Sequence, residues 1–216
     1  MTSSVSIITP SYNNLTGLIR LLASLEKLSW PKDKLHVYIC NDGSTDDTQQ
    51  YFESQEYSFK VVVLSLKKNS GPARARNLGL EKVDSDLVLF LDSDVEVAPD
   101  LIERHVELYS DPDVVAVRGE NQSLGGASKS KWRRYLDSDL RGPRRNFHKN
   151  GTTRIDYSEV NTNNFSVRTA ILENGLMFDE NIIHYGGEDM IFAYEISKMK
   201  LGSIIYQPNA VTFHQQ

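Results

Sequence analysis

Short apolar runs alternate with helical patterns through the first 120 residues, and this alternation limits the fold more than any other feature. Five runs have the composition of buried strands: 5–9, 35–40, 59–66, 86–91 and 114–119. Between them lie stretches with helical spacing of apolar residues: 15–28, 48–52, 71–83 and 101–109. Strands that alternate with helices form a mostly parallel sheet, because each crossover returns the chain to the same edge. We therefore predict an α/β fold with a mostly parallel central sheet and helices on both faces.

The second half has a different pattern. Between residues 129 and 154 the apolar periodicity is weak, and nine basic residues stand against only Asp137 and Asp139. Predicted strands at 163–167 and 203–207 enclose a short helix from Thr169 and a second helix that ends at Met199. We find no linker or internal repeat and predict one domain, residues 1–216, in which 1–120 form the sheet and 121–216 a mixed second half.

Charge and cysteine content exclude several classes of protein. The net charge of −5 argues against a nucleic-acid-binding protein. Cys40 is the only cysteine, so neither an intrachain disulfide nor a cysteine-rich metal site is possible, and we expect a small buried side chain. The first residues lack the pattern of a signal peptide, and no apolar run is long enough to span a membrane. We expect a soluble cytoplasmic protein that can meet the inner face of a membrane through a lipid-linked substrate.

The sequence LFLDSDVEV, residues 89–97, ends an apolar strand in three carboxylates: Asp92, Asp94 and Glu96. Like charges at this spacing repel unless a cation lies among them. Ligands of parallel α/β sheets bind beyond the carboxyl ends of the strands, and Mn²⁺ and Mg²⁺ prefer carboxylate and phosphate oxygens. No glycine-rich phosphate loop, nucleophile elbow or HExxH helix is present. An ordinary acidic turn before a helix remains the alternative at this point.

Six motifs in order then resemble those of one family. They are IITPSYNN (7–14), NDGSTDDT (41–48), NSGPARARNLGL (69–80), FLDSDVEV (90–97), NNFSVRTAIL (163–172) and GGEDMIFAYEI (186–196). From Val5 to about His214 the chain looks like a family-2 glycosyltransferase with the nucleotide-diphospho-sugar transferase fold, also called the A-type glycosyltransferase fold. The Asp-x-Asp pair alone is a weak signal, whereas the ordered series is a strong one.

The resemblance implies a donor site in the first half. Pro10, Tyr12 and Asn13 would line the nucleotide pocket, Asp42 would accept a hydrogen bond from uracil, and Arg74 would lie near the diphosphate or the base. Asp92 and Ser93 would contact the nucleotide-sugar, Asp94 would bind a divalent cation (Mn²⁺ or Mg²⁺), and His214 would support that cation or the diphosphate. Arg74 and Arg76 fit an exposed helix face equally well.

The resemblance also implies a catalytic pair in the second half. Asp189 would be the general base, and Glu188 would bind the acceptor or orient the site. The family inverts configuration at the sugar carbon. Independently, a displacement requires a carboxylate to take the proton of the acceptor hydroxyl and a cation to stabilise the departing diphosphate. At the start of a helix, Asp189 is expected to remain ionised.

The predicted function is therefore transfer of a sugar from a UDP-sugar to a glycan, lipid-linked or anionic polymer acceptor. Two alternatives remain: an inactive module of a longer protein that binds a nucleotide-sugar or glycan, and a sugar-phosphate nucleotidyltransferase. The latter lacks support because TPSYNN (9–14) stands where such enzymes carry a glycine-rich loop with arginine. The basic segment 129–154 is either a solvated loop or a contact for an anionic acceptor. The histidines other than His214 show no metal spacing and are expected to be structural or on the surface.

Overall fold

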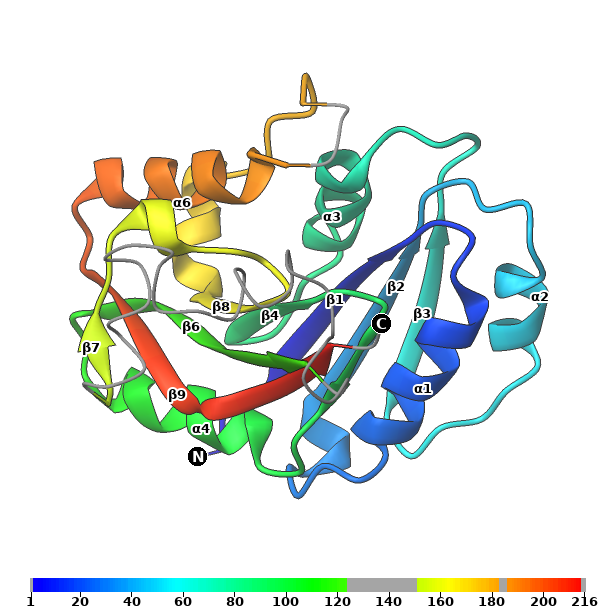
Figure 1. The fold of residues 1–216 in the computed structure, drawn as a ribbon, viewed down its shortest axis with the longest axis horizontal. Helices are drawn as coiled ribbons and strands as arrows, with labels where there is room; N and C mark the ends of the chain where they lie inside the picture. Colours follow the sequence, from blue (N-terminus) through cyan, green and yellow to red (C-terminus); the bar gives the residue numbers. More distant parts are fainter. Residues whose placement is uncertain (1, 124–150, 183–185, 215–216) are drawn as a thin grey trace, which may run out of the picture.

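A nine-stranded sheet forms the centre of the part of the chain that the computed structural model describes, residues 2–123, 151–182 and 186–214 (Figure 1). The strand order is β3-β2-β1-β4-β8-β6-β9-β5, and β7 pairs with β9. The strands are β1 (Val5–Ser11), β2 (Leu35–Asn41), β3 (Lys60–Ser65), β4 (Leu87–Leu91), β5 (Val95–Val97), β6 (Val114–Ser123), β7 (Thr153–Arg154), β8 (Asn164–Arg168) and β9 (Ser203–His214). The helices are α1 (Leu15–Leu25), α2 (Thr48–Glu53), α3 (Pro72–Leu80), α4 (Leu101–Val106) and α6 (Glu188–Met199).

The strand directions change across the sheet. Strands β3, β2, β1 and β4 pair in parallel, as the alternation of strands and helices predicts. Beyond β4, β8 pairs antiparallel with both β4 and β6, whereas β6 and β9 are parallel. The predicted α/β layers are present, with α3 and α6 on one face and α1 and α4 on the other (Figure 1). The sequence did not indicate the antiparallel pairs, because local periodicity carries no information on which distant strand a segment joins.

Several element boundaries differ from the prediction. Strands β5 and β7 were not predicted, and β9 continues seven residues beyond 207, to His214. The segment Thr169–Asn174 is a 3₁₀ helix, and α1 ends at Leu25 because the chain turns there. The basic segment lies outside the described residues, apart from its last residues, where Arg154 belongs to β7. No helix in the described ranges is long and apolar enough to cross a membrane.

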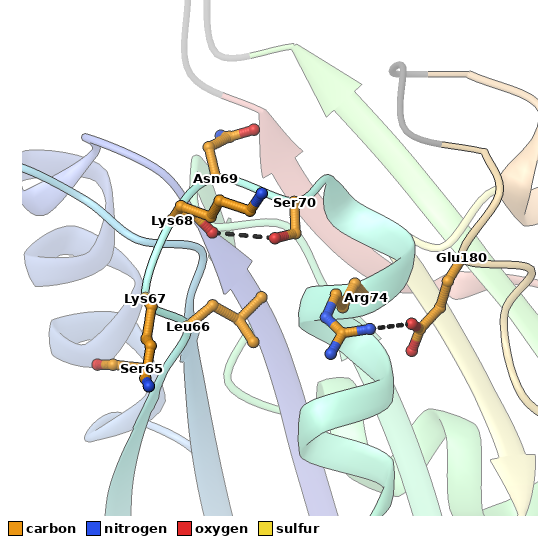
Figure 2. Close-up of a pocket in the computed structure, with 8 residues that line it drawn as sticks. All are labelled: Ser65, Leu66, Lys67, Lys68, Asn69, Ser70, Arg74 and Glu180. Carbon is orange, nitrogen blue, oxygen red and sulfur yellow. Dashed lines mark hydrogen bonds and ion pairs between the residues drawn. The ribbon is translucent and has the colours of Figure 1, made fainter.

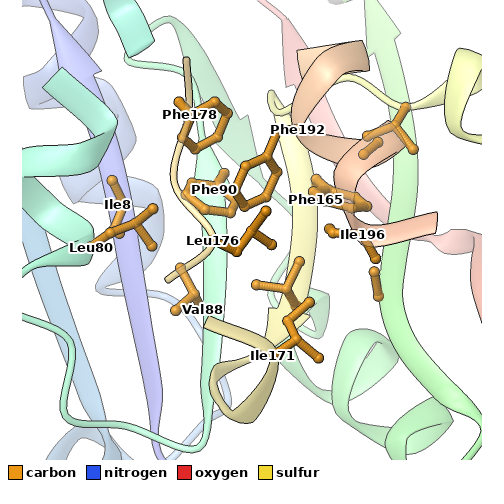
Figure 3. Close-up of a cluster of buried hydrophobic side chains, with 14 of the residues drawn as sticks. Ile8, Leu80, Val88, Phe90, Phe165, Ile171, Leu176, Phe178, Phe192 and Ile196 are labelled. Carbon is orange, nitrogen blue, oxygen red and sulfur yellow. The ribbon is translucent and has the colours of Figure 1, made fainter. Parts of the chain in front are cut away.

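Alternating side chains of the central strands build two apolar layers. Ile7 and Leu89 face the layer under α1, while Ile8 and Phe90 face the layer under α3 and α6. Figure 3 shows the second layer, in which Phe178 stacks on Phe192 with ring centroids 4.1 Å apart and Phe90 packs edge-on against both. These aromatic contacts fix α6 against the sheet.

Cys40 is the buried filler that the sequence predicted. A Cβ on Gly79 of α3 would lie 2.8 Å from its sulfur, so α3 packs closely on the sheet at this point. Burial raises the pKa of the Cys40 thiol to about 12, which keeps it neutral.

His105 lies in a buried polar network between α4 and β8. Its Nε2 donates to Oδ1 of Asn164 (2.8 Å), and its Nδ1 accepts from the hydroxyl of Ser166 (2.8 Å). The Asn164 amide nitrogen donates to the carbonyls of Glu120 and Ala210, which fixes its Oδ1 as the acceptor. His105 is therefore structural, as expected from its spacing, and burial lowers its pKa from 6.5 to about 4.

We predict that His105 makes the protein less stable in mild acid. Below pH 6.5 the unfolded chain takes up a proton on His105 that the folded protein accepts only near pH 4. The contribution of neutral His105 to the free energy of unfolding is therefore complete above pH 6.5 and is lost as the pH falls toward 4. The loss reaches about 3 kcal/mol. Urea denaturation from pH 7.5 to 4.5 measures the slope, and His105→Gln should reduce it by up to about 1.4 kcal/mol per pH unit. An unchanged slope in the variant would contradict the assignment.

Candidate functional site

The carboxyl ends of three parallel strands bring six of the predicted donor-site residues together: Pro10, Tyr12, Asp42, Asp92, Ser93 and Asp94. Ser11 of β1 aligns with Asn41 of β2, and Phe90 of β4 aligns with Ile8 of β1, so the loops that follow these strands lie at one edge. Between the loops is a cavity of about 460 Å³, which we call the donor cavity. It is lined by Pro10, Ser11, Tyr12, Asp42, Asn69, Gly71, Pro72, Arg76, Asp92, Ser93 and Asp94.

Asp42 is a buried residue of the donor cavity. Its carboxylate accepts backbone hydrogen bonds from Ser70 (2.7 Å) and Gly71 (2.9 Å), which anchor the loop before α3. Gly71 has φ +94°, a conformation that favours glycine, and Pro72 then begins the helix. Burial raises the pKa of Asp42, and the two backbone hydrogen bonds oppose this effect. The carboxylate retains lone pairs for a further donor such as a ring N–H.

Tyr12 and Asn13 differ in their roles. The Tyr12 side chain is half exposed and lines the donor cavity. Asn13 does not line this cavity: its Oδ1 accepts from the backbone N–H of Thr45 (2.8 Å), and its own N–H donates to Ser44 (2.9 Å). With φ +50°, Asn13 adopts a left-handed backbone conformation. Its two hydrogen bonds tie the loop after β1 to the loop after β2.

Ser93 is fixed to the start of α1. Its hydroxyl accepts a hydrogen bond from Asn14 (3.0 Å), whose Oδ1 caps α1 at the N–H of Gly17. A Cβ on Gly17 would lie 2.5 Å from the Ser93 carbonyl, so only glycine permits this approach. The loop 92–94 is thus held by contacts that do not involve a ligand.

Arg76, which the sequence left as a candidate for an exposed helix face, is fully buried at the centre of the site. Its guanidinium lies 3.1 Å from Asp92, 3.1 Å from Glu188 and 3.6 Å from Asp189. It also lies over the ring of Phe178, 5.5 Å from the centroid. One cation therefore joins the acidic loop after β4 to the first turn of α6. We call these four charged residues the Arg76 cluster.

Burial and charge act in opposite directions within the Arg76 cluster. Burial lowers the pKa of Arg76, but the carboxylates of Asp92, Asp189 and Glu188 outweigh this effect and the net shift is upward. Burial raises the pKa of Asp92; Arg76 counters the shift, while Asp189 and Asp94 add to it. The contact with Arg76 therefore favours the charged form of Asp92 and opposes the effect of burial.

Glu188 and Asp189 are adjacent but present their carboxylates differently. Glu188 is buried, with one oxygen on Arg76 and the other accepting from the N–H of Gly186 (2.9 Å). Asp189 is one-quarter exposed, and its Oδ1 accepts from the hydroxyl of Thr162 (2.5 Å). Among the described residues, no partner contacts its Oδ2. Glu188 is almost fully buried and does not line the donor cavity, so it can orient the site, whereas Asp189 is partly exposed and keeps Oδ2 for an acceptor.

Asp94, which lines the donor cavity, contacts His214, and both side chains are partly exposed. Val95 of β5 pairs with His214 of β9, and this register places His214 Nε2 3.1 Å from Asp94 Oδ2. The described residues contain no cluster of three or more metal-ligating side chains. One carboxylate and one imidazole nevertheless fit a Mn²⁺ or Mg²⁺ ion that takes its other ligands from a diphosphate and water.

Arg74 lies apart from the donor cavity. It is half exposed, contacts Glu180 and lines a second cavity with the loop after β3 (Figure 2). The helical period explains why Arg76 lies in the site and Arg74 does not. Ala73, Arg76 and Leu80 share the buried face of α3, whereas Arg74 lies outside it. That period was the available signal for Arg76. Nothing in the local sequence indicated that Thr162 contacts Asp189, because this contact depends on where α6 packs in the folded chain.

Sequence comparison finds similarity to glycosyltransferases in a family model and in individual proteins. Residues 6–174 match the family model described as glycosyl transferase family 2. An uncharacterized glycosyltransferase of Haemophilus influenzae is 30% identical over 97% of this chain and 78% of its own length. The poly(ribitol-phosphate) β-N-acetylglucosaminyltransferase TarS of Staphylococcus aureus is 34% identical over 54% of this chain, a match that spans only 21% of TarS.

Two solved structures share the fold. A crystal structure of TarS residues 1–349 with UDP has a TM-score of 0.77 at 22% identity and covers 99% of this chain and 60% of that one. The mannosyltransferase PcManGT of Pyrobaculum calidifontis, in complex with GDP-Man and Mn²⁺, has a TM-score of 0.76 at 21% identity, covering 99% and 57%. The predicted A-type glycosyltransferase fold is confirmed.

We predict that Arg76→Met destabilises the protein far more than Arg74→Met, although both residues lie in α3. Loss of Arg76 leaves the buried Glu188 without its cation and should cost about 3–5 kcal/mol. Loss of the half-exposed pair between Arg74 and Glu180 should cost no more than about 1 kcal/mol. Urea denaturation at pH 7.5 measures both values, and equal losses would show that Arg76 does not hold the cluster together.

Proposed function

The chain belongs to glycosyl transferase family 2, and on this basis we propose that it transfers a sugar from a UDP-sugar to an acceptor hydroxyl by metal-assisted, inverting displacement. The acceptor class is a glycan, a lipid-linked sugar or an anionic polymer. The family match removes the basis for a sugar-phosphate nucleotidyltransferase. The predicted enzyme class, glycosyltransferase, is confirmed at the level of the family.

The observation that carries this proposal is the contact of donor-side and base-side carboxylates with one guanidinium. Asp92 lines the donor cavity, and Asp189 lies 3.6 Å from the same Arg76. A displacement requires donor and acceptor to meet within a few ångströms, and the Arg76 cluster supports that geometry. We also propose that residues 1–216 act as one domain, with donor binding in 1–120 and acceptor binding and the base in 121–216.

Asp189 is the proposed general base. Its Oδ1 is held by Thr162 and Arg76, so Oδ2 is the oxygen available to take the proton of the acceptor hydroxyl. A positioned base of this kind typically contributes ~10²–10⁴-fold to the rate. The negative charge of Asp189 is favoured by its place in the first turn of α6.

Asp94 and His214 are the proposed residues that hold a divalent cation, Mn²⁺ or Mg²⁺. Such an ion, when bound, supplies positive charge that stabilises the departing diphosphate. Asp42 is the proposed acceptor for the uracil N–H, and Asp92 and Ser93 are proposed to contact the nucleotide-sugar.

The relatives support these details to different degrees. The TarS structure was determined with UDP, and the TarS name specifies N-acetylglucosamine transfer to poly(ribitol-phosphate). PcManGT supports a divalent cation but carries a guanine nucleotide. We propose UDP because the TarS structure was determined with UDP, and because Asp42 offers a carboxylate acceptor in the donor cavity for the N–H of uracil. A cytoplasmic location, at the inner membrane face for a lipid-linked acceptor, is part of the same proposal.

We predict Mn²⁺-dependent release of UDP from one of several UDP-sugars, and a fall of ~10²–10⁴-fold in kcat for Asp189→Asn. The measurement is UDP release with an acceptor present, and UDP affinity should change little because Asp189 does not line the donor cavity. A functional enzyme with an unaffected Asn variant would exclude Asp189 as the base, and absence of release from all UDP-sugars would favour an inactive binding module.

Two Thr162 variants in the same assay test whether Thr162 positions Asp189, with Thr162→Ser as the control. Thr162→Val removes the hydrogen bond to Oδ1 and should lower kcat by roughly 10- to 150-fold, because a hydrogen bond to a charged group is worth roughly 1.5–3 kcal/mol. Thr162→Ser keeps the hydroxyl and should retain most of the activity.

A further inference from the structure

A second cavity, of about 840 Å³, lies next to the donor cavity and shares Asn69 with it. It is formed by the loop after β3, the first turns of α3 and the segment around Glu180 (Figure 2). Its lining is Ser65, Leu66, Lys67, Lys68, Asn69, Ser70, Arg74 and Glu180. We call it the basic cavity. The activity proposed above assigns it no role.

The basic cavity is positively charged on a chain whose net charge is −5. Three basic residues line it against the single carboxylate of Glu180. Lys67 and Lys68 are exposed, and neither ammonium group has a hydrogen bond or ion pair with any described residue. Figure 2 shows the Lys68 side chain extending alongside Ser70, whereas that of Lys67 turns toward Ser65. Lys68 and Arg74 are therefore the principal donors at this surface.

Arg74 is held in position by a chain of contacts that begins in the core. The buried Asn77 accepts from the backbone N–H of Phe178 (2.9 Å) and donates to its carbonyl (3.0 Å). The same amide nitrogen donates to Glu180 (3.0 Å), and Glu180 in turn contacts one terminal nitrogen of Arg74. A guanidinium carries five N–H donors, so most of those on Arg74 remain free to face the cavity. The side chain is pre-oriented, which lowers the entropic cost of binding a ligand there.

We propose that the basic cavity binds a phosphate group of a polyanionic acceptor while the donor occupies the adjacent cavity. This inference rests on the proposed function and extends it to the acceptor class. A planar guanidinium beside a lysine ammonium is suited to phosphate oxygens. The phosphates of the donor are the other source of the same chemistry, but we place them at the divalent cation proposed for Asp94 and His214, and Asp94 lines the donor cavity only. An acceptor with repeated phosphates could bind both near Asp189 and at Arg74.

The test is binding of a labelled glycerol-phosphate hexamer, measured by fluorescence anisotropy at low ionic strength. The double variant Lys68→Gln/Arg74→Gln should bind the hexamer at least tenfold more weakly than the unmodified chain. Lys60→Gln removes a charge from the exposed, opposite end of β3 and should stay within twofold. Saturating UDP and Mn²⁺ should also leave hexamer affinity within twofold, because the two ligands occupy different cavities.

Three results would overturn the proposal. They are no binding of the hexamer, equal weakening by Lys60→Gln and by the double variant, and displacement of the hexamer by UDP. The last would assign Lys68 and Arg74 to the donor phosphates. UDP affinity measured on the same proteins separates this inference from the proposed function. If the unmodified chain does not bind UDP, the proposed function is contradicted, whether or not the hexamer binds.

Discussion

The buried guanidinium of Arg76 is the interaction on which the site depends. A cation without partners in this environment would be strongly destabilising, and Asp92, Glu188 and Asp189 together compensate for its burial. These carboxylates come from the end of β4 and the first turn of α6, which lie about a hundred residues apart in the chain. The ion cluster therefore fixes where the second half meets the sheet, and the stacked rings of Phe178 and Phe192 support the same junction from the apolar side.

Burial, more than residue type, assigns different roles to the four aspartates and one glutamate of the site. Glu188 has both oxygens occupied inside the protein, so it balances charge and orients its neighbour. Asp189 keeps one oxygen open, and Asp94 faces outward beside His214. Asp42 and Asp92 are desolvated on the cavity wall, which raises the pKa of each. The same carboxylate chemistry thus supports a proposed base, a proposed metal ligand and proposed contacts to a nucleotide.

The parts of the site predictable from sequence are those that follow from local pattern. Alternating strands and helices predicted that the loops after β1, β2 and β4 converge, and Tyr12, Asp42 and Asp94 do line one cavity. The two arginines of α3 were harder to assign, because Arg74 and Arg76 differ only in helical phase. Asn13, Thr162 and the antiparallel strand β8 depend on contacts between distant segments, which no local pattern specifies. The role of each residue toward a donor or acceptor remains a prediction.

A crystal structure of the protein with UDP and Mn²⁺ is the most direct test of the proposed site. We expect uracil against Asp42, the diphosphate and the ion at Asp94 and His214, and Asp92 and Asp189 still in contact with Arg76. UDP bound between Lys68 and Arg74 instead, or a cluster in which Arg76 has released Asp189, would contradict it.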